Sequence, residues 1–502
     1  MSIRWSLMMA ALLVACNSPT PPPRSPDQKF WDAHLFFDLD KEVDRYACPA
    51  EGKIPSWLRG TLLRNGPAKF KVGERRVDWF DGLAMIHGFE FVPEGVFYTN
   101  RFLRSEQYYL MVNEKSLDFE GFSMDPHHAL LKSLLPSSVP EAMKNIHNAD
   151  VSLQEYANRL VALTEIPLPV VFDGRSLNTL GNFHYADALQ QGQWESAHPQ
   201  RDPKTNETVN YFVRFGERSS YVIWKMADHA SSRQVIAEIP VERPAYMHSF
   251  ALTENYAVLV EFPFVVHPLD LVLHKKPFIF NYQWAPELGT TFLVVDRRTG
   301  EVRRLKGEPF FAFHHVNAFE ADHEIVIDTI TYANADIIRA VSGQITEASK
   351  VRSAEQTRLE RFTLDLEAKK LSRELLFDVP SELPRVAAAR TAQKYQYGYA
   401  PDIRFPTSTR DVRPLYKFDV TSKTNLKWEE AGCFPGEAIF VPHPQGTSED
   451  SGVVLSLVLD MRNRSSFLLM LDATDFKELA RVRTPFAIPV GLHGMWKEIS
   501  SK

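Results

Sequence analysis

The chain has 502 residues and a formal net charge of −6, from 57 basic and 63 acidic side chains. Hydrophobic residues make up 44% of the sequence and aromatic residues 12%, so the chain can bury a large core. The charges are balanced and no long run of one sign stands out, which gives no electrostatic footprint for nucleic acid. Length and composition therefore favour a large globular protein and argue against one that binds nucleic acid.

The N-terminal residues predict an exported lipoprotein. Arg4 precedes an apolar or small run at residues 5–14, which is too short to span a bilayer and is typical of a signal-peptide core. The Leu-Val-Ala-Cys sequence that ends at Cys16 resembles the bacterial lipoprotein processing site, where the cysteine is lipidated and becomes the mature N-terminus. Residues 1–15 are therefore predicted to be a lipoprotein signal peptide, with an ordinary secretory signal and an incidental cysteine as the alternative.

Residues 16–30 contain the Pro-rich sequence NSPTPPPR and are predicted to be a tether. No later segment is long and apolar enough to cross a membrane. We therefore expect the protein in the bacterial cell envelope, anchored by a lipid to the outer membrane or at the periplasmic face. Two more cysteines, Cys48 and Cys433, are far apart, and the sequence leaves open whether they form a disulfide or two separate buried thiols.

From about Asp38 onward, short β-like runs alternate with turn signals, and several runs end in an Asp followed by a polar turn and a second strand. The clearest runs are Gly60–Arg64, Gly95–Asn100, Arg159–Glu165, Tyr211–Arg214, Tyr256–Phe262, Thr291–Asp296, Glu324–Ile330, Leu415–Asp419 and Gly452–Asp460. Many short strands favour an all-β sandwich, barrel or propeller. The length favours the propeller, because so large a core must be divided among several sheets. Residues 31–502 are predicted to form a single domain, since no convincing linker follows.

Helical signals are confined to insertions between these runs. They cover Pro126–Leu135, Glu141–Ile146 and Glu347–Arg361. Short helices of this kind suit a position over one face of the β scaffold.

Four of the 16 histidines have similar contexts, each after an apolar or small residue and beside strand-like sequence. They are His198, His248, His314 and His493. Their spread over about 300 residues excludes a helical HExxH site or a zinc finger, whose ligands are close in sequence. Such distant side chains can bind one metal ion only if the fold brings separate strands to one axis, as in a propeller. For any single histidine, a buried, hydrogen-bonded core position is the commoner outcome.

Several motifs together resemble the carotenoid cleavage oxygenase family, especially its animal β-carotene oxygenase and retinoid isomerohydrolase branch. The motifs are LRGTLLRNGP at 58–67, WFDGLAMIH at 79–87, SAHP at 196–199, HSFALTENY at 248–256, FHHVNAFE at 313–320 and IPVGLHG at 488–494. They follow one another in order over most of the chain. The resemblance implies a seven-bladed β-propeller with a dome of helices and loops over the face that carries the active site.

The resemblance also implies iron(II), Fe(2+), as the cofactor, with the four histidines as its ligands. In that family, three glutamates accept hydrogen bonds from ligand imidazoles, and the matching positions are Glu165, Glu382 and Glu437. A carboxylate on the outer ring nitrogen fixes the tautomer and makes the imidazole a stronger donor. Three glutamates leave one imidazole without a carboxylate, and we expect this one to be His198.

Four neutral imidazoles leave a metal ion its full dipositive charge and, in an octahedral site, two open positions. Imidazole suits zinc, copper, iron and nickel, so the donor set alone does not choose the metal. The resemblance implies a dioxygenase that inserts both atoms of dioxygen across a C=C bond of a hydrophobic polyene, giving two carbonyl products. We expect a carotenoid or apocarotenoid substrate, and the sequence leaves the cleaved bond open.

Other activities stay open as alternatives. Stilbene-cleaving relatives carry a lysine immediately before the first of the three glutamates, and Thr164 at that position cannot supply this positive charge. A stilbene-type dioxygenase is therefore less favoured. A metal-dependent, retinoid-like isomerase or ester-cleaving enzyme on the same site is a further alternative, as is a non-catalytic propeller that binds a pigment.

Residues 268–284, PLDLVLHKKPFIFNYQW, combine large apolar side chains with two lysines. This composition suits a patch that dips into a lipid surface, and relatives carry a membrane-binding insert here. A buried loop or a dimer contact is an equal alternative.

Overall fold

The computed structural model describes residues 24–498, except residues 118, 120, 125–138, 190–191, 274–275 and 346. The predicted signal peptide, Cys16 and the first part of the predicted tether lie outside the described residues, as does the helix predicted at Pro126–Leu135. The part of the chain that is described consists mainly of β-strands with short helices between them.

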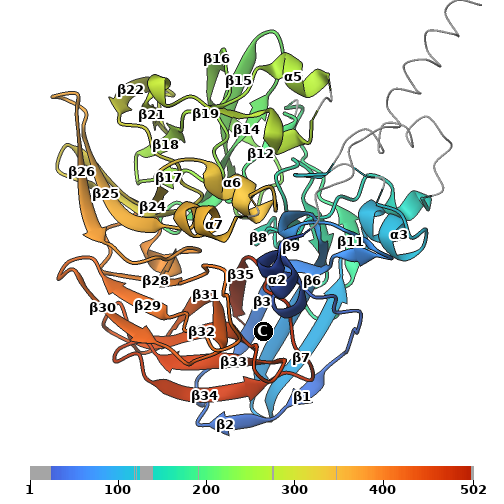
Figure 1. The fold of residues 1–502 in the computed structure, drawn as a ribbon. Helices are drawn as coiled ribbons and strands as arrows, with labels where there is room; N and C mark the ends of the chain where they lie inside the picture. The colour runs from blue at the N-terminus through green and yellow to red at the C-terminus, as the bar shows by residue number, and fades with distance from the viewer. Residues whose placement is uncertain are drawn as a thin grey trace, which may run out of the picture.

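Seven antiparallel sheets of four or five strands stand around one axis (Figure 1), which confirms the predicted seven-bladed β-propeller. Each blade is given from its innermost strand outward, and the first consists of β35 (Gly494–Glu498), β3 (Gly60–Lys69), β6 (Leu83–Val92), β7 (Gly95–Phe102) and β1 (Tyr46–Cys48). The second blade consists of β8 (Ser152–Tyr156), β9 (Arg159–Leu163), β10 (Val170–Phe172) and β11 (Thr179–Asn182), and the third of β12 (Trp194–Glu195) with β13 (Gln200–Asp202), β14 (Glu207–Arg214), β15 (Ser219–Ala227) and β16 (Gln234–Val241). The fourth blade consists of β17 (Ala251–Leu252), β18 (Tyr256–Glu261), β21 (Thr290–Asp296) and β22 (Val302–Gly307). The fifth blade consists of β23 (His315–Ala321), β24 (Glu324–Tyr332), β25 (Thr357–Asp365) and β26 (Lys370–Phe377). The sixth consists of β27 (Arg385–Val386), β28 (Tyr397–Pro401), β29 (Leu415–Asp419) and β30 (Thr424–Trp428). The seventh consists of β31 (Cys433–Pro442), β32 (Gly452–Asp460), β33 (Ser465–Asp472), β34 (Glu478–Arg483) and β2 (Ala50–Gly52).

Local sequence explains both the strands and the turns of a blade. The middle strand β33 has six consecutive buried residues, because each blade packs against neighbours on both faces. The turns repeat an aspartate whose carboxylate accepts hydrogen bonds from the backbone N–H groups two and three residues later. Asp296, Asp365 and Asp419 all do this, at 2.7–2.9 Å. These turns are the structural form of the Asp-and-turn pattern in the sequence.

Strands from the two ends of the propeller sequence close the ring. β35 pairs with β3, with Gly60 opposite Glu498 and Arg64 opposite Gly494. β2 pairs with β34 of the blade that precedes this one around the ring. The first blade is therefore complete only with residues 494–498, and the last blade only with residues 50–52.

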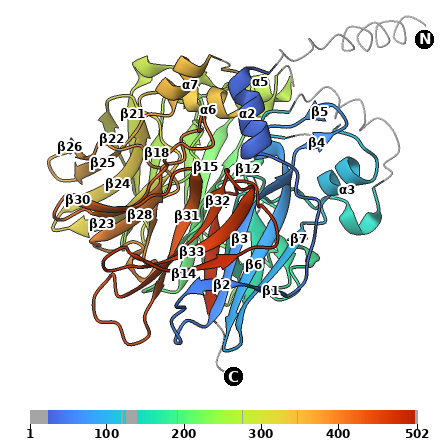
Figure 2. The ribbon, with the colours of Figure 1, turned by 60° about the horizontal axis from the view of Figure 1, so that its bottom comes forward.

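Helices gather on one face of the propeller and form a dome (Figure 2). They are α2 (Pro26–His34), α5 (Pro268–Val272), α6 (Asp336–Val341) and α7 (Ala348–Ala354), with the strand pair β4 (Lys71–Val72) and β5 (Arg75–Arg76) nearby, while α3 (Glu106–Val112) lies to one side. A second two-stranded pair is formed by β19 (Phe264–Val265) and β20 (Gln283–Trp284). α5, α6 and α7 all lie between the second and third strands of a blade. Because the second strand is antiparallel to the innermost one, these connections start where the innermost strand begins. The dome therefore covers that end of the channel.

Residues 26–30, predicted to be part of the tether, are instead the first turns of α2. The Ser25 hydroxyl accepts a hydrogen bond from the Gln28 backbone N–H at 3.2 Å, and the Gln28 side chain accepts one from the Ser25 N–H at 2.9 Å. With Pro26 at the first helical position, this capping box starts a helix directly after the Pro-rich sequence. Trp31 is buried and its indole N–H donates to the carbonyl oxygen of Pro406 at 2.7 Å, so α2 is part of the folded protein. The tether prediction is wrong for these residues.

The segment Glu347–Arg361, predicted as one helix, is helical only in α7. Thr357 begins β25, which pairs with β24 and with β26. Backbone hydrogen bonds on both sides outweigh the helix-favouring composition of residues 357–361. The shorter predicted helix at Glu141–Ile146 is a 3₁₀ turn, η2, at Glu141–Met143.

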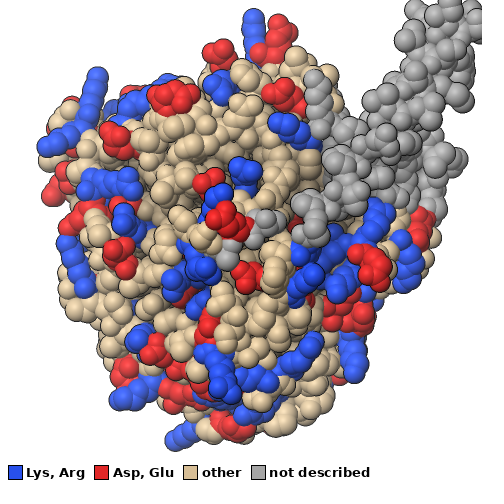
Figure 3. All heavy atoms as spheres, in the orientation of Figure 1, with Lys and Arg blue, Asp and Glu red and all other residues tan. Residues whose placement is uncertain are grey.

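Among the described residues, acidic and basic side chains are interspersed over the dome face without a large area of one sign (Figure 3). Within the described ranges, no helix is long and apolar enough to cross a membrane. Cys48 is half-buried and Cys433 buried, and both are free thiols.

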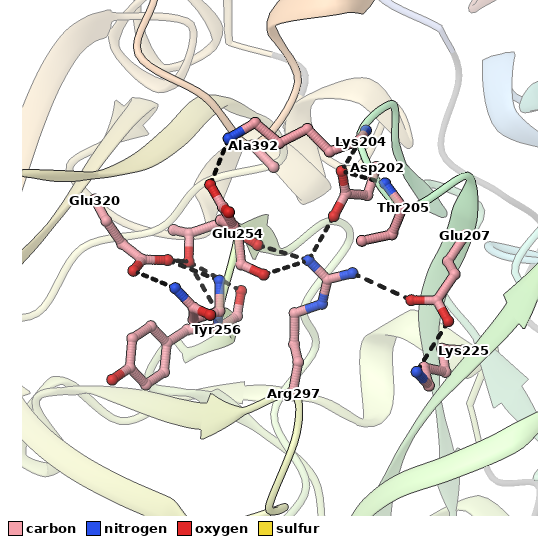
Figure 4. Close-up of polar contacts among 12 residues, drawn as sticks. Asp202, Lys204, Thr205, Glu207, Lys225, Glu254, Tyr256, Arg297, Glu320 and Ala392 are labelled. Carbon is pink, nitrogen blue, oxygen red and sulfur yellow. Dashed lines mark hydrogen bonds and ion pairs between the residues drawn. The ribbon is translucent and has the colours of Figure 1, made fainter.

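Buried polar contacts join three successive blades at the far ends of their innermost strands (Figure 4). Nη1 of Arg297 donates to Oδ2 of Asp202 at 2.8 Å and to the carbonyl oxygens of Thr253 and Glu254 at 2.9 and 2.8 Å. Glu320, on β23, accepts a hydrogen bond from the Thr253 hydroxyl at 2.6 Å. This clamp fixes the spacing of β13, β17 and β23, and each of these strands begins next to one of the predicted ligands.

Candidate metal centre

Four histidines from four blades meet at the dome end of the channel. One ring nitrogen of each lies within 4.8 Å of a ring nitrogen of each of the others. Nε2 of His198 is 2.9 Å from Nε2 of His248, and Nε2 of His314 is 3.2 Å from Nε2 of His493. The structure therefore brings together all four of the histidines singled out from the sequence.

The topology explains this convergence. His198 comes shortly before β13, His248 before β17, His314 before β23 and His493 before β35. Innermost strands of a propeller run in one direction and begin at the same end of the channel. Residues that precede them are therefore neighbours in space although they are distant in sequence.

A carboxyl group lies against the outer nitrogen of three rings. The distances are 2.7 Å from Nδ1 of His248 to Oε1 of Glu165, 2.5 Å from Nδ1 of His314 to Oε2 of Glu382, and 2.8 Å from Nδ1 of His493 to Oε1 of Glu437. With Nδ1–H donating to a carboxylate, Nε2 keeps the lone pair that binds a metal ion. Among the described residues, no carboxylate hydrogen-bonds the ring of His198.

Burial favours the neutral form of three of the rings. It lowers the pKa of His493 to about 3, and it lowers the pKa values of His198 and His314 well below their usual range. The neighbouring imidazoles lower the pKa of His198 further. Neutral imidazole is the form that binds metal ions.

Two of the carboxyl groups differ in what surrounds them. Burial opposes ionisation of Glu437, but Arg385 and Arg64 outweigh it and hold the pKa of Glu437 well below its usual range. Nε of Arg385 donates to Oε1 at 2.6 Å, and Arg64 donates to Oε2. Glu382 accepts a hydrogen bond from the hydroxyl of Tyr332 instead, and burial raises the pKa of Glu382 to about 7.

The donor set fits one transition-metal ion. Ligands on opposite sides of an ion bound at roughly 2.1 Å are about 4.2 Å apart. The four nitrogens all lie within 4.8 Å of one another, which suits such an ion. Calcium and magnesium prefer oxygen ligands, whereas imidazole suits zinc, copper, iron and nickel. The four imidazoles therefore suit an ion of the second group, with the carboxyl groups acting from behind the rings.

Two cavities adjoin this centre, one of about 710 Å³ and one of about 1070 Å³. Both are lined by Phe80, Val151, His248 and Phe313, so these side chains form the junction between the cavities. The smaller cavity is also lined by His314 and by other residues of the centre. A substrate at the junction would lie directly beside the imidazoles.

Sequence reasoning missed Arg64, Arg385 and Val151. Arg64 is the one charged residue in the first nine positions of the strand sequence GTLLRNGPAK, and a buried arginine in such a strand requires a buried acid, which was a usable signal. Val151 comes directly before the innermost strand β8, as His314 and His493 come directly before β23 and β35. Only the topology shows that this position faces the centre.

Known proteins resemble the chain over most of its length. A family model described as retinal pigment epithelial membrane protein matches residues 36–498. The chain is 29% identical to β,β-carotene 15,15′-dioxygenase of Mus musculus, over 92% of this chain and 91% of that protein. It is 28% identical to apocarotenoid-15,15′-oxygenase of Synechocystis sp., over 95% and 99%, and 29% identical to the chloroplastic carotenoid cleavage dioxygenase 8 of Arabidopsis thaliana, over 89% and 82%.

Solved structures agree with these matches. A crystal structure of an ACO/RPE65 chimera has a TM-score of 0.82 at 26% identity and covers 95% of this chain and 100% of its own. A variant of Synechocystis apocarotenoid oxygenase has a TM-score of 0.81 at 26% identity, with the same coverage. The chain therefore belongs to the carotenoid cleavage oxygenase family of enzymes.

Proposed function

We propose that this enzyme is a non-haem iron(II) dioxygenase that cleaves one C=C double bond of a carotenoid or apocarotenoid into two carbonyl products. The observation that carries the proposal is the set of four imidazoles at the junction of two cavities, with carboxyl groups only on the outer ring nitrogens. Iron(II), when bound, supplies the activation of dioxygen. The protein's own residues position the polyene and keep water away.

The junction residues would select the double bond that is cleaved. Phe80, Val151 and Phe313 line both cavities, so a rigid polyene that enters both has one short stretch beside the imidazoles. The depth to which each end can enter its cavity then determines which bond lies there. The names of relatives, which include carotene and apocarotenoid oxygenases, support a polyene substrate.

Thr164, next to Glu165, lines the larger cavity. A threonine hydroxyl provides no positive charge to hold a phenolate, which argues for a polyene and against a stilbene.

We also propose that the protein is exported and held at a membrane by a lipid on Cys16, with residues 268–284 as a second contact. Leu269 and Leu273 in this segment are 66% and 48% exposed. Phe278, in η3 (Phe278–Asn281), lines the larger cavity, so the segment joins the surface to the proposed substrate path. A second apolar contact would add to the membrane affinity that the lipid provides.

Metal and product analysis test the proposed activity. Protein loaded with iron(II) without oxygen is assayed on a panel of carotenoids and apocarotenoids, with and without dioxygen. We expect stoichiometric iron and paired carbonyl products that form only with dioxygen. Isomerisation or ester cleavage without dioxygen would favour the isomerase alternative, and polyene binding without iron or turnover would favour a pigment-binding protein.

A further inference from the structure

The smaller cavity has an apolar wall with a few buried polar groups set into it. Its apolar lining includes Trp79, Phe80, Ile337, Val341, Phe405 and Leu492. Its polar lining, apart from the residues of the metal centre, consists of Glu355, Thr357, Ser381, Asp402 and Arg404. A polyene without polar substituents could form no hydrogen bond with these groups.

Two of the polar groups have no hydrogen-bond partner among the residues that the structure describes. Oε2 of Glu355 and Oγ of Ser381 are buried and unpaired, and the two residues are 6% and 3% exposed. The other groups are satisfied, since Arg404 donates to Asp402 at 2.7 Å and Thr357 exchanges hydrogen bonds with the backbone of Ser381. Buried polar atoms are normally paired, so the two exceptions call for a ligand or a bound water.

The two unpaired groups belong to adjoining segments. Oγ1 of Thr357, two residues after Glu355, donates to the carbonyl oxygen of Ser381 at 2.9 Å and accepts from its N–H at 2.8 Å. Ser381 directly precedes Glu382, which lies against His314. The unpaired groups are therefore fixed to the same framework as the metal centre.

We propose that this cavity binds a hydroxyl-bearing end group of the substrate, with Oε2 of Glu355 accepting the hydroxyl hydrogen and Ser381 as a second polar contact. The inference rests on the proposed function and narrows its substrate to hydroxylated carotenoids or apocarotenoids. The hydroxyl would pair the two buried groups while Ile337, Val341 and Phe405 cover the carbon atoms of the end group.

The chemistry of Glu355 favours a hydroxyl over other end groups. Its Oε1 already accepts the backbone N–H of Phe405 at 2.7 Å, which leaves Oε2 for the ligand. Burial raises the pKa of Glu355 to about 7, so the ionised state is present near neutral pH, and it holds a hydroxyl more strongly than a neutral side chain does. A carboxylate end group would be repelled by the ionised state, and an unsubstituted ring would leave both protein groups unpaired.

The test uses two apocarotenoids of equal length, one with a ring hydroxyl and one without. Dissociation constants are measured from tryptophan fluorescence quenching without oxygen, and kcat/KM from aerobic turnover. We expect the wild-type protein to prefer the hydroxylated compound by at least about 10-fold in both measurements. Ser381→Ala and Glu355→Gln should each reduce this preference at least about threefold, with affinity for the unsubstituted compound little changed.

Two matched variants control for loss of a buried polar group. Two buried residues do not line the cavity: Ser342, whose Oγ has no partner within the described ranges, and Glu195, whose Oε1 accepts the indole N–H of Trp224. Ser342→Ala and Glu195→Gln should keep the wild-type preference. Equal affinity of the wild-type protein for both compounds, or an unchanged preference in Ser381→Ala and Glu355→Gln, would overturn the inference alone. Failure to bind either polyene would contradict the proposed function itself.

Discussion

Each carboxyl group beside an imidazole is held by a different set of donors. Glu437 binds two arginines, whereas Glu382 accepts from a tyrosine hydroxyl and from the backbone N–H of Leu383. Glu165 accepts from the hydroxyl of Tyr246 at 2.8 Å and the indole N–H of Trp194 at 3.2 Å. At the scale of single residues, the three positions are therefore not interchangeable, and substitutions at or beside them should have different effects.

Replacing Glu382 tests its influence on the metal ion. Glu382→Gln keeps the shape of the side chain but removes the charge that strengthens His314 as a donor. We expect iron affinity or activity to fall about 10–100-fold, measured by iron titration and by turnover. Glu195→Gln, which replaces a buried carboxyl group away from the metal centre, should keep wild-type iron affinity and activity. Iron binding and turnover at the wild-type level in Glu382→Gln would contradict this role.

Replacing Arg64 tests the buried ion pair. The side chains of Arg64 and Glu437 are 4% and 0% exposed, so Arg64→Met leaves a buried carboxylate with one arginine fewer. We expect the free energy of unfolding to fall by about 3–5 kcal/mol, measured by urea denaturation. The comparison is Arg385→Met. Because Arg385 is 37% exposed, this substitution should lower the free energy of unfolding by less than Arg64→Met does. A larger loss in Arg385→Met than in Arg64→Met would count against this explanation.

At the scale of elements, the position of His493 depends on close contact between β3 and the segment before β35. The backbone N–H of Leu492 donates to the carbonyl oxygen of Asn65 at 2.9 Å, and the backbone N–H of Asn65 donates to the carbonyl oxygen of His493 at 2.7 Å. A Cβ on Gly66 would lie 2.5 Å from Cα of Gly491. The two segments approach this closely only because Gly66 has no side chain.

Gly66→Ala should therefore displace His493. We expect iron affinity to fall at least about 10-fold and stability by about 1–3 kcal/mol, measured by iron titration and by urea denaturation. Gly88 in β6 is the control, because a Cβ there would meet its nearest neighbour, in Leu177, at an ordinary 3.5 Å. Gly88→Ala should bind iron normally. Normal iron affinity in Gly66→Ala would show that the close approach does not position the ligand.

Elements whose signals are local could be predicted from the sequence. Leu415–Asp419 and Gly452–Asp460 are strands with the predicted bounds, since apolar runs and Asp-containing turns act within a few residues. Residues 357–361 were predicted as helix because their pairing with β24 and β26 is not visible locally. The contact between Arg64 and Glu437 joins residues 373 positions apart and depends on which blades adjoin at closure.

At the scale of the whole molecule, the dome face combines the features proposed to meet a membrane. α2, which follows the proposed tether, and α5, which carries Leu269, both lie on this face (Figure 2). A lipid on Cys16 would therefore hold the dome towards the bilayer. In that orientation the exposed leucines of residues 268–284 would lie near the lipid surface.

Charged substitutions test this orientation. In a Cys16→Ser background, which lacks the proposed lipid, Leu269→Asp with Leu273→Asp should reduce binding to lipid vesicles at least about 10-fold in flotation assays, since each leucine contributes about 1.5–3 kcal/mol when buried. Leu180→Asp with Val235→Asp is the matched control, because these side chains are 65% and 48% exposed on outer strands. Equal losses in the two double variants would exclude a specific lipid contact.

The pairing of β35 with β3 also sets the order in which a newly made protein becomes able to take up its metal. His493 directly precedes β35, so a growing chain on the ribosome carries three imidazoles long before the fourth is synthesised. Neither the closed ring nor the set of four imidazoles is complete without residues 493–498. A product of premature termination before residue 493 would therefore lack both the closed ring and the fourth imidazole.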